Sequence, residues 1–143
     1  MNVFAVTCIV TLISNLAIAI LFLIKVQDKS IAKNFGWTSL ASSTWAFGAS
    51  FFSVSRTFEE ALFWIKIAHI GIILTPVFFT HFVIQYTNSN EKLLKRFTYA
   101  LAFLFLSLNF FDANFYDIHF VFNQFYFFKA TLSKNPFYII FYL

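Results

Sequence analysis

Apolar residues in this chain gather into long runs that are separated by short polar segments. Four of these runs cover residues 3–24, 35–54, 62–85 and 93–111. A transmembrane α-helix needs about 20 mainly apolar residues, and each run meets that need, since Lys95 and Arg96 of the fourth run can extend toward lipid headgroups. We therefore predict an all-α fold, a polytopic transmembrane helix bundle with four full spans, in which short loops make consecutive helices antiparallel neighbours.

The segment after the fourth run has a different pattern. Residues 112–135 form a long loop whose centre, 119–128, is rich in aromatic and β-branched residues, a composition that favours strands. We expect a short β-hairpin there, turning at Asn123-Gln124. The fifth apolar run, residues 136–143, would reach only about 12 Å as a helix, less than half of a bilayer. We therefore expect the start of a fifth span, in a chain that is a fragment, a truncated product or the remnant of a frameshifted gene.

Basic residues orient the predicted spans. Loops 25–34 and 86–96 carry three Lys or Arg each, whereas segment 55–61 carries one Arg against two Glu. Cytoplasmic loops are enriched in Lys and Arg, so we expect both basic loops in the cytoplasm, and the N-terminus and the extracytoplasmic hairpin segment 112–135 outside. The net charge of +4 is explained by this topology. Residues 1–143 are predicted to form one multi-pass region of the cell (inner) membrane.

Composition and motif spacing exclude several functional classes. Charged residues make up 11% of the chain and hydrophobic residues 60%, whereas a globular protein carries roughly 25% charged residues. The three glycines lie too far apart for a phosphate-binding loop, and the three histidines lack the spacing of a zinc site. No Asp or Glu lies within a predicted span, which argues against a carboxylate proton relay. We therefore expect no catalytic residue, metal, cofactor or nucleic-acid partner.

Polar and small residues follow helical spacing in the first two spans. Thr7, Thr11 and Asn15 share one face, and Asn15 falls near the bilayer centre, where an unpaired amide is costly. We expect Asn15 to face protein and to form an interhelical hydrogen bond; an ion or signal site is the alternative. The second span carries a heptad seam of small residues: Ser39, Ser42, Ala46, Ala49 and Ser53. The seam predicts a closely packed inner helix, with a ligand-lining face as the alternative.

The third span holds most of the candidate functional residues. Trp64 falls at its outer end, where amphipathic rings usually lie, and Lys66 and His69 share a face because they are three residues apart. His81 and Gln85 lie four residues apart near the cytoplasmic end. We expect a structural hydrogen bond at this pair, and pH sensing by His81 is the alternative.

Pro76 interrupts the third span. Because proline has no N–H, Pro76 removes the hydrogen bond to the Ile72 carbonyl, which predicts a bend in the helix. Gly71, just over one turn earlier, is expected to give this bend room. The bend is either a fixed feature or a hinge, and the sequence leaves both interpretations open.

An ordered set of residues in this region is similar to a known family. The set runs from Ser55–Lys66 through Gly71 and Pro76 to the pair His81 and Phe82, just before a basic loop. In this order it resembles the N-terminal seven-transmembrane region of bacterial sensor histidine kinases, and the resemblance covers roughly residues 34–99. Lys66 departs from the family pattern, because Arg is the commoner residue there.

The resemblance implies seven spans, a signal-input role in a two-component system and a kinase transmitter elsewhere. A transmitter needs a phospho-accepting His followed by an acidic residue, whereas His69, His81 and His119 are followed by Ile or Phe. The chain also lacks a glycine-rich segment that would form an ATP lid. We therefore expect that this polypeptide is not a kinase by itself.

These patterns predict a membrane-embedded sensor region. It would receive an extracytoplasmic or intramembrane stimulus and pass a shift inward through the third span. Its expected partners are the lipid bilayer, an unidentified small ligand, and a second copy of the chain in a homodimer formed through the helix bundle. The alternative is a small structural integral-membrane subunit or a transporter fragment, but of the midplane sites that transporters use, only Asn15 and the Pro76 region qualify.

Overall fold

The described part of the chain is almost entirely helical. The computed structural model describes residues 3–26, 30–110, 117–121 and 125–129. These residues form four helices and two strands, in the order α1 (Val3–Ile20), α2 (Ser30–Phe52), α3 (Phe58–Tyr86), α4 (Lys92–Phe110), β1 (Asp117–Val121) and β2 (Phe125–Lys129). A π-helical turn over Leu21–Lys25 extends α1 at its end. The four apolar runs of the sequence therefore each correspond to one helix.

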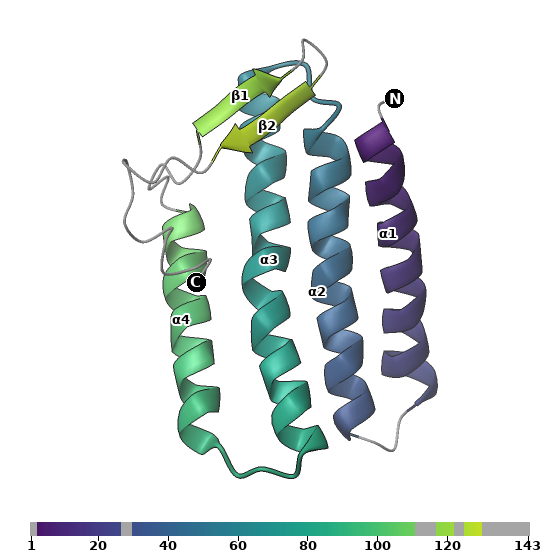
Figure 1. Ribbon diagram of the computed structural model, residues 1–143, viewed down its shortest axis with the longest axis vertical. Helices are drawn as coiled ribbons and strands as arrows, with labels where there is room; N and C mark the ends of the chain where they lie inside the picture. The colour runs from purple at the N-terminus through teal and green to yellow at the C-terminus, as the bar shows by residue number, and fades with distance from the viewer. Residues whose placement is uncertain (1–2, 27–29, 111–116, 122–124, 130–143) are drawn as a thin grey trace.

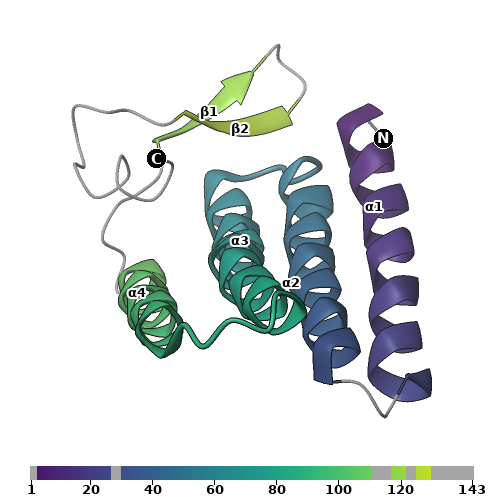
Figure 2. The ribbon, with the colours of Figure 1, turned by 60° about the horizontal axis from the view of Figure 1, so that its bottom comes forward.

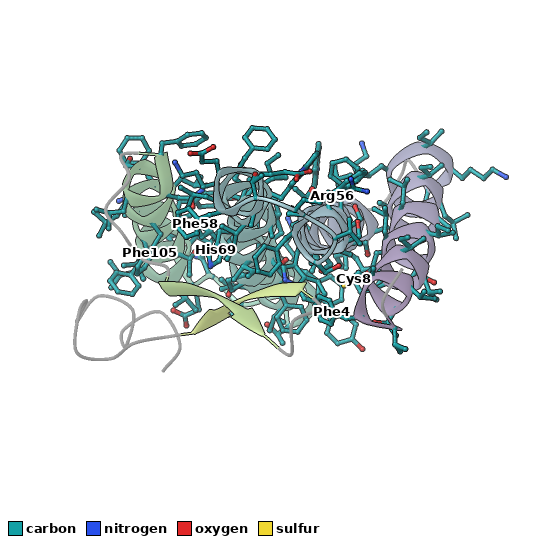
Figure 3. All side chains as sticks on the ribbon, turned by 90° about the horizontal axis from the view of Figure 1, so that it is seen from above. Phe4, Cys8, Arg56, Phe58, His69 and Phe105 are labelled. Atoms are coloured by element: carbon teal, nitrogen blue, oxygen red, sulfur yellow. The ribbon has the colours of Figure 1, made fainter. Side chains whose placement is uncertain are left out.

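The four helices stand side by side in chain order, and each is antiparallel to the next (Figure 1). Seen along their axes they form a single row, with α2 and α3 inside and α1 and α4 at the two edges (Figure 3). The contact between α2 and α3 is the most extensive, followed by those of α1 with α2 and of α3 with α4. The predicted antiparallel neighbours are confirmed, but within the described residues they make an open layer rather than a closed bundle.

Three of the four helices are long and apolar enough to cross a membrane: Val3–Lys25, Phe58–Tyr86 and Lys92–Phe110. The remaining helix, α2, is of similar length, but its many Ser, Thr and Gly residues make it less apolar. Its small residues are buried, among them Ser39, Ala46 and Ala49. This burial confirms the predicted closely packed inner helix, whereas the count of four spans stays a prediction.

Two glycines set the distance between α2 and α3. A Cβ atom added at Gly48 would lie 2.5 Å from the Ala68 backbone nitrogen, and one added at Gly71 would lie 2.5 Å from the Ala41 carbonyl oxygen and would also meet the Trp45 backbone. The two helices therefore touch backbone to backbone, as small residues permit in lipid. Gly71 has this packing role, which the sequence did not reveal.

Helix α3 begins and ends with local capping interactions. The Thr57 hydroxyl accepts a hydrogen bond from the Glu60 backbone N–H (3.2 Å), and the Glu60 carboxylate accepts one from the Arg56 backbone N–H (3.0 Å). This variant of the capping box satisfies N–H groups that a helix start leaves unpaired. At the other end Asn88 takes a left-handed conformation (φ 51°), and the Ser89 N–H donates to the Ile84 carbonyl (3.0 Å) in a Schellman-type cap.

The two strands lie at one end of the helix row. They pair antiparallel, with Ile118 opposite Phe128 and Val121 opposite Phe125, and β1 contacts α3. The N-terminus of α1 and the α2–α3 turn lie at the same end of the row (Figures 1 and 2). The strands fall within the segment for which the sequence predicts a hairpin, but its turn, the rest of loop 112–135 and the fifth run, 136–143, lie outside the described residues.

Candidate functional site

A cavity of about 450 Å³ lies where α1, α2 and α3 meet. It is open at the surface of the helix row, and we call it the Asn15 cavity. Its lining comprises Thr11 and Asn15 of α1, Ser42 and Trp45 of α2, and Ile72, Thr75 and Pro76 of α3. Four of these side chains carry a hydroxyl or an amide, and none is charged. Its volume falls in the range of about 300–1,000 Å³ that is usual for small-molecule sites.

Two of the polar groups in this lining are occupied by their own helix. The Thr11 hydroxyl donates to the Thr7 carbonyl (2.9 Å), and the Thr75 hydroxyl donates to the Gly71 carbonyl (2.8 Å). Such bonds to the preceding turn are common for hydroxyl side chains inside helices. The Thr11 and Thr75 hydroxyls therefore line the cavity, but each has already used its one donor and can only accept a further hydrogen bond.

Two other polar groups are available in the lining. The Asn15 amide nitrogen donates to the Thr11 carbonyl (3.0 Å), whereas neither its oxygen nor the Ser42 hydroxyl has a hydrogen-bond partner among the described residues. The expectation that Asn15 faces protein is met, because it lines a cavity that three helices share. Among the described residues Asn15 does not form the expected interhelical hydrogen bond, because its amide nitrogen donates to a carbonyl in the preceding turn of α1.

Pro76 lies between this cavity and a second one. The second cavity, of about 180 Å³, separates α3 from α4, and we call it the Thr98 cavity. Its lining comprises Ile73, Pro76 and Val77 of α3 and Thr98, Leu101, Ala102 and Phe105 of α4. Pro76 itself is exposed, and α3 continues through it as one helix. Pro76 has no N–H to donate to the Ile72 carbonyl, so the backbone hydrogen bonding of α3 is weaker at this position. At the same position the helix borders one cavity on each of two sides.

The N-terminal half of α3 is held firmly against α2. Besides the contacts at the two glycines, the Trp64 ring stacks on Phe51 at a centroid distance of 4.4 Å and meets Phe47 edge-on at 5.7 Å. Aromatic pairs at such distances contribute about 0.5–1.5 kcal/mol beyond the area they bury. Trp64 therefore fastens α3 to α2 at this end.

The other end of α3 is also held. Phe82 lies 5.4 Å from Phe35 of α2, whose ring is 5.2 Å from Phe22 at the end of α1. The Asn34 amide nitrogen donates to the Gln85 side-chain oxygen at 2.6 Å, which joins α2 to α3. The part of α3 around Pro76 thus lies between two anchored ends.

Polar contacts also link α3 to α4. His81 Nδ1 lies 3.2 Å from the Tyr99 hydroxyl, and the Lys66 carbonyl accepts a hydrogen bond from the Asn109 amide nitrogen (3.0 Å). His81 and Gln85 thus both form hydrogen bonds, each with a different neighbouring helix. The sequence reasoning missed Asn109, although an amide within an apolar run was a usable signal.

His69 is buried in the N-terminal half of α3. Its Nδ1 lies 2.9 Å from the Ile65 carbonyl oxygen, and because a carbonyl only accepts, Nδ1 carries the proton of this bond. Four-residue spacing places His69 in line with Ile73 and Val77, which form a core cluster with Ala102 of α4. Figure 3 shows His69 on the side of α3 that faces α4. Its ring is therefore part of the α3–α4 packing.

Within the part of the chain that the structure describes, no group of three or more His, Cys, Asp or Glu residues is arranged to hold a metal ion. Of the candidate residues, Asn15 and Pro76 meet at the Asn15 cavity. The other candidates lie away from its lining, at the contacts that fix α3 to its neighbours: Trp64, Lys66, His69, Gly71, His81 and Phe82.

Comparison with known proteins gives one finding. The model of a family described as the N-terminal 7TM region of histidine kinase matches residues 5–143. The matched segment includes both cavities and every helix contact described above. Neither a comparison with curated proteins nor one with solved structures found a match.

Proposed function

This chain belongs to the family of N-terminal seven-transmembrane regions of histidine kinases, and from that premise we propose that it is the signal-input region of such a kinase. A region of this kind is not itself a kinase domain. The proposed role is to receive a stimulus from outside the cell or from within the bilayer and to pass it on as a rearrangement of helices. The three apolar helices that are able to span a membrane support this placement in the bilayer.

The observation that carries the proposal is the position of Pro76 in α3. The helix is anchored to α2 on both sides of Pro76, by Trp64 in one half and by Gln85 in the other. Between these anchors it borders the Asn15 cavity on one side and the Thr98 cavity on the other. A helix segment that lacks one backbone hydrogen bond and borders a cavity can move without disrupting closely packed side chains. We therefore propose that this part of α3 shifts toward α4 when a ligand occupies the Asn15 cavity.

A shift of this kind transmits a signal only if the stimulus has a different affinity for the two helix arrangements. A ligand in the Asn15 cavity would touch α1, α2 and α3 at once, so its contacts would change when α3 moves. The contacts of α3 with α4 at Tyr99 and Asn109 would pass the movement on. In this proposal loops 25–34 and 86–96 are cytoplasmic and the N-terminus is outside. Helix α2 also crosses the inner membrane, which brings the number of spans among α1 to α4 to four.

The experiment that tests the function uses a full-length histidine kinase that carries this region. Pro76→Ala restores an N–H that can donate to the Ile72 carbonyl, so the α3 segment should stiffen. We expect autophosphorylation in membrane vesicles to change several-fold from the unmodified level while the protein amount stays equal. The matched control is Val83→Ala, which also shortens an exposed side chain of α3 but borders neither cavity. Equal kinase output from the unmodified protein and from Pro76→Ala would contradict the proposed role of α3.

A further inference from the structure

We propose that the Asn15 cavity binds an uncharged amphiphile, a molecule with one hydroxyl or amide head and a medium-length alkyl tail. The head would bond to Asn15 and Ser42, and the tail would lie against Trp45, Ile72 and Pro76. The binding follows from the lining of the cavity, whereas its effect on signalling rests on the proposed function. The two are therefore tested by separate readouts.

The hydrogen-bonding groups of the cavity define the head group. The Asn15 oxygen is an acceptor without a partner among the described residues, and the Ser42 hydroxyl can both donate and accept. A hydroxyl or amide head can donate to one of these acceptors and accept from Ser42. An alkane would leave the polar atoms unsatisfied, which is costly away from water.

The charge of the lining limits the ligand to neutral molecules. None of the seven lining residues carries a charge. A carboxylate or an ammonium group that entered the cavity would lose its hydration without gaining an ionic partner, and this cost is far larger than for a neutral polar group. The cavity therefore discriminates against fatty acids and amines that share the same tail.

The surroundings of the cavity indicate how a ligand enters. The cavity is open at the surface of the helix row, and α1, which lies at the edge of the row, exposes large apolar side chains, including Ile13 and Leu16. In a bilayer these residues face hydrocarbon, where an amphiphile concentrates. The volume of about 450 Å³ suits one small ligand. Lateral entry from the membrane is therefore the expected route.

The test measures binding directly in the full chain. The protein is reconstituted in phosphatidylcholine vesicles and photolabelled with octanol that carries a diazirine group, and labelled residues are located by mass spectrometry. Unlabelled octanol, octane and octanoate then compete. Labelling at Phe103, an exposed residue of α4 far from the cavity, reports the lipid background. We expect saturable labelling of cavity residues that octanol suppresses at concentrations at least about 10-fold lower than octane or octanoate, because only octanol satisfies the polar groups without bringing a charge.

Variants identify the anchoring groups. Asn15→Leu and Ser42→Ala each remove one polar partner, and a single neutral hydrogen bond is equivalent to about 2- to 10-fold in affinity. We expect each variant to weaken competition by octanol by that factor and to leave competition by octane unchanged. The matched control is Ser43→Ala, because this neighbouring hydroxyl donates to the Leu40 carbonyl (2.7 Å) and lies outside the lining. It should compete like the unmodified chain.

Three results would overturn the inference. Equal competition by octane would mean that the cavity takes an ordinary acyl chain, and equal competition by octanoate would mean that it does not select neutral molecules. Labelling confined to lipid-facing residues would mean that the Asn15 cavity does not bind the amphiphile, either because another helix occupies it or because it has no specific ligand. All three results are measured on the unmodified chain, so a folding defect in a variant does not affect them. Saturable cavity labelling without any effect of octanol on the output of a kinase carrying this region would contradict the proposed function and leave the binding site standing.

Discussion

Glycine determines the geometry of this helix row at two positions where no other residue fits. Gly48 and Gly71 lie where the backbones of α2 and α3 touch, and a Cβ atom at either would meet backbone atoms of the other helix. Backbone cannot move aside as a side chain can. The α2–α3 contact depends on these two positions, and both helices contribute residues to the lining of the Asn15 cavity.

Gly71→Ala tests this dependence. The added Cβ would meet the Trp45 backbone and the Ala41 carbonyl oxygen, so α2 and α3 must separate, at a cost of about 1–3 kcal/mol. We expect the free energy of unfolding to fall by that amount in a denaturant titration in detergent. Gly36→Ala is the matched control, because the atoms nearest to its Cβ would belong to the side chains of Leu23 and Phe22 and not to a backbone. A loss no larger for Gly71→Ala than for Gly36→Ala would show that the contact is not as close as described.

At the scale of elements, the hydrophobic runs located the helices but not all of their ends. Helix α3 begins at Phe58 rather than at residue 62, because Thr57 and Glu60 cap it before the apolar run starts. Helix α2 begins at Ser30 rather than at residue 35, since polar residues of its first turns extend the helix beyond the apolar run. Charged and capping residues near a span thus lengthen the helix, which a hydrophobicity pattern does not record.

The contacts between helices were harder to predict than the helices. Spacing placed Asn15 on a protein-facing side and marked α2 as an inner helix, because both depend on one helix alone. The cavities, the Asn34–Gln85 bond and the two glycine contacts depend on how neighbouring helices are rotated and offset. The spacing of residues within one helix does not specify the rotation and offset of its neighbours.

A double-mutant cycle tests the anchor at the end of α3 opposite Trp64. The Asn34 and Gln85 side chains form a 2.6 Å hydrogen bond, and side-chain hydrogen bonds between transmembrane helices contribute about 0.6 kcal/mol on average. We expect Asn34→Ala and Gln85→Ala to show a coupling energy of about this size in reversible unfolding. Thr38→Ala with Gln85→Ala is the control pair, because Thr38 bonds only to its own helix. Additive effects of Asn34→Ala and Gln85→Ala would contradict the anchor.

At the scale of the whole molecule, the helices make an open layer. The inner helices α2 and α3 are tightly packed against each other, whereas the edge helices α1 and α4 have less extensive contacts. Helix α4 buries only Ala102 and Asn109, whereas α3 has buried residues from Ala61 to Ile84. Among the described residues, the α3–α4 contact comprises a small core cluster, the His69 ring, the two polar links and the Thr98 cavity. The most adaptable interface among the described residues therefore lies beside Pro76, on the side away from the proposed ligand.

The central claim is that a change in spacing between α3 and α4 at the Thr98 cavity alters kinase output. The most direct measurement uses a full-length kinase carrying this region, with Cys8→Ala and any other cysteine removed, and with Val77→Cys and Ala102→Cys introduced in the core cluster that the two helices share. Oxidation then closes a disulfide across the interface, and its extent is followed by gel mobility. Each single-cysteine variant serves as a control for the oxidant. Our account predicts that the cross-linked kinase shifts to one fixed level of autophosphorylation and that reduction restores the original level. The same autophosphorylation in the fully cross-linked and the reduced protein would contradict it.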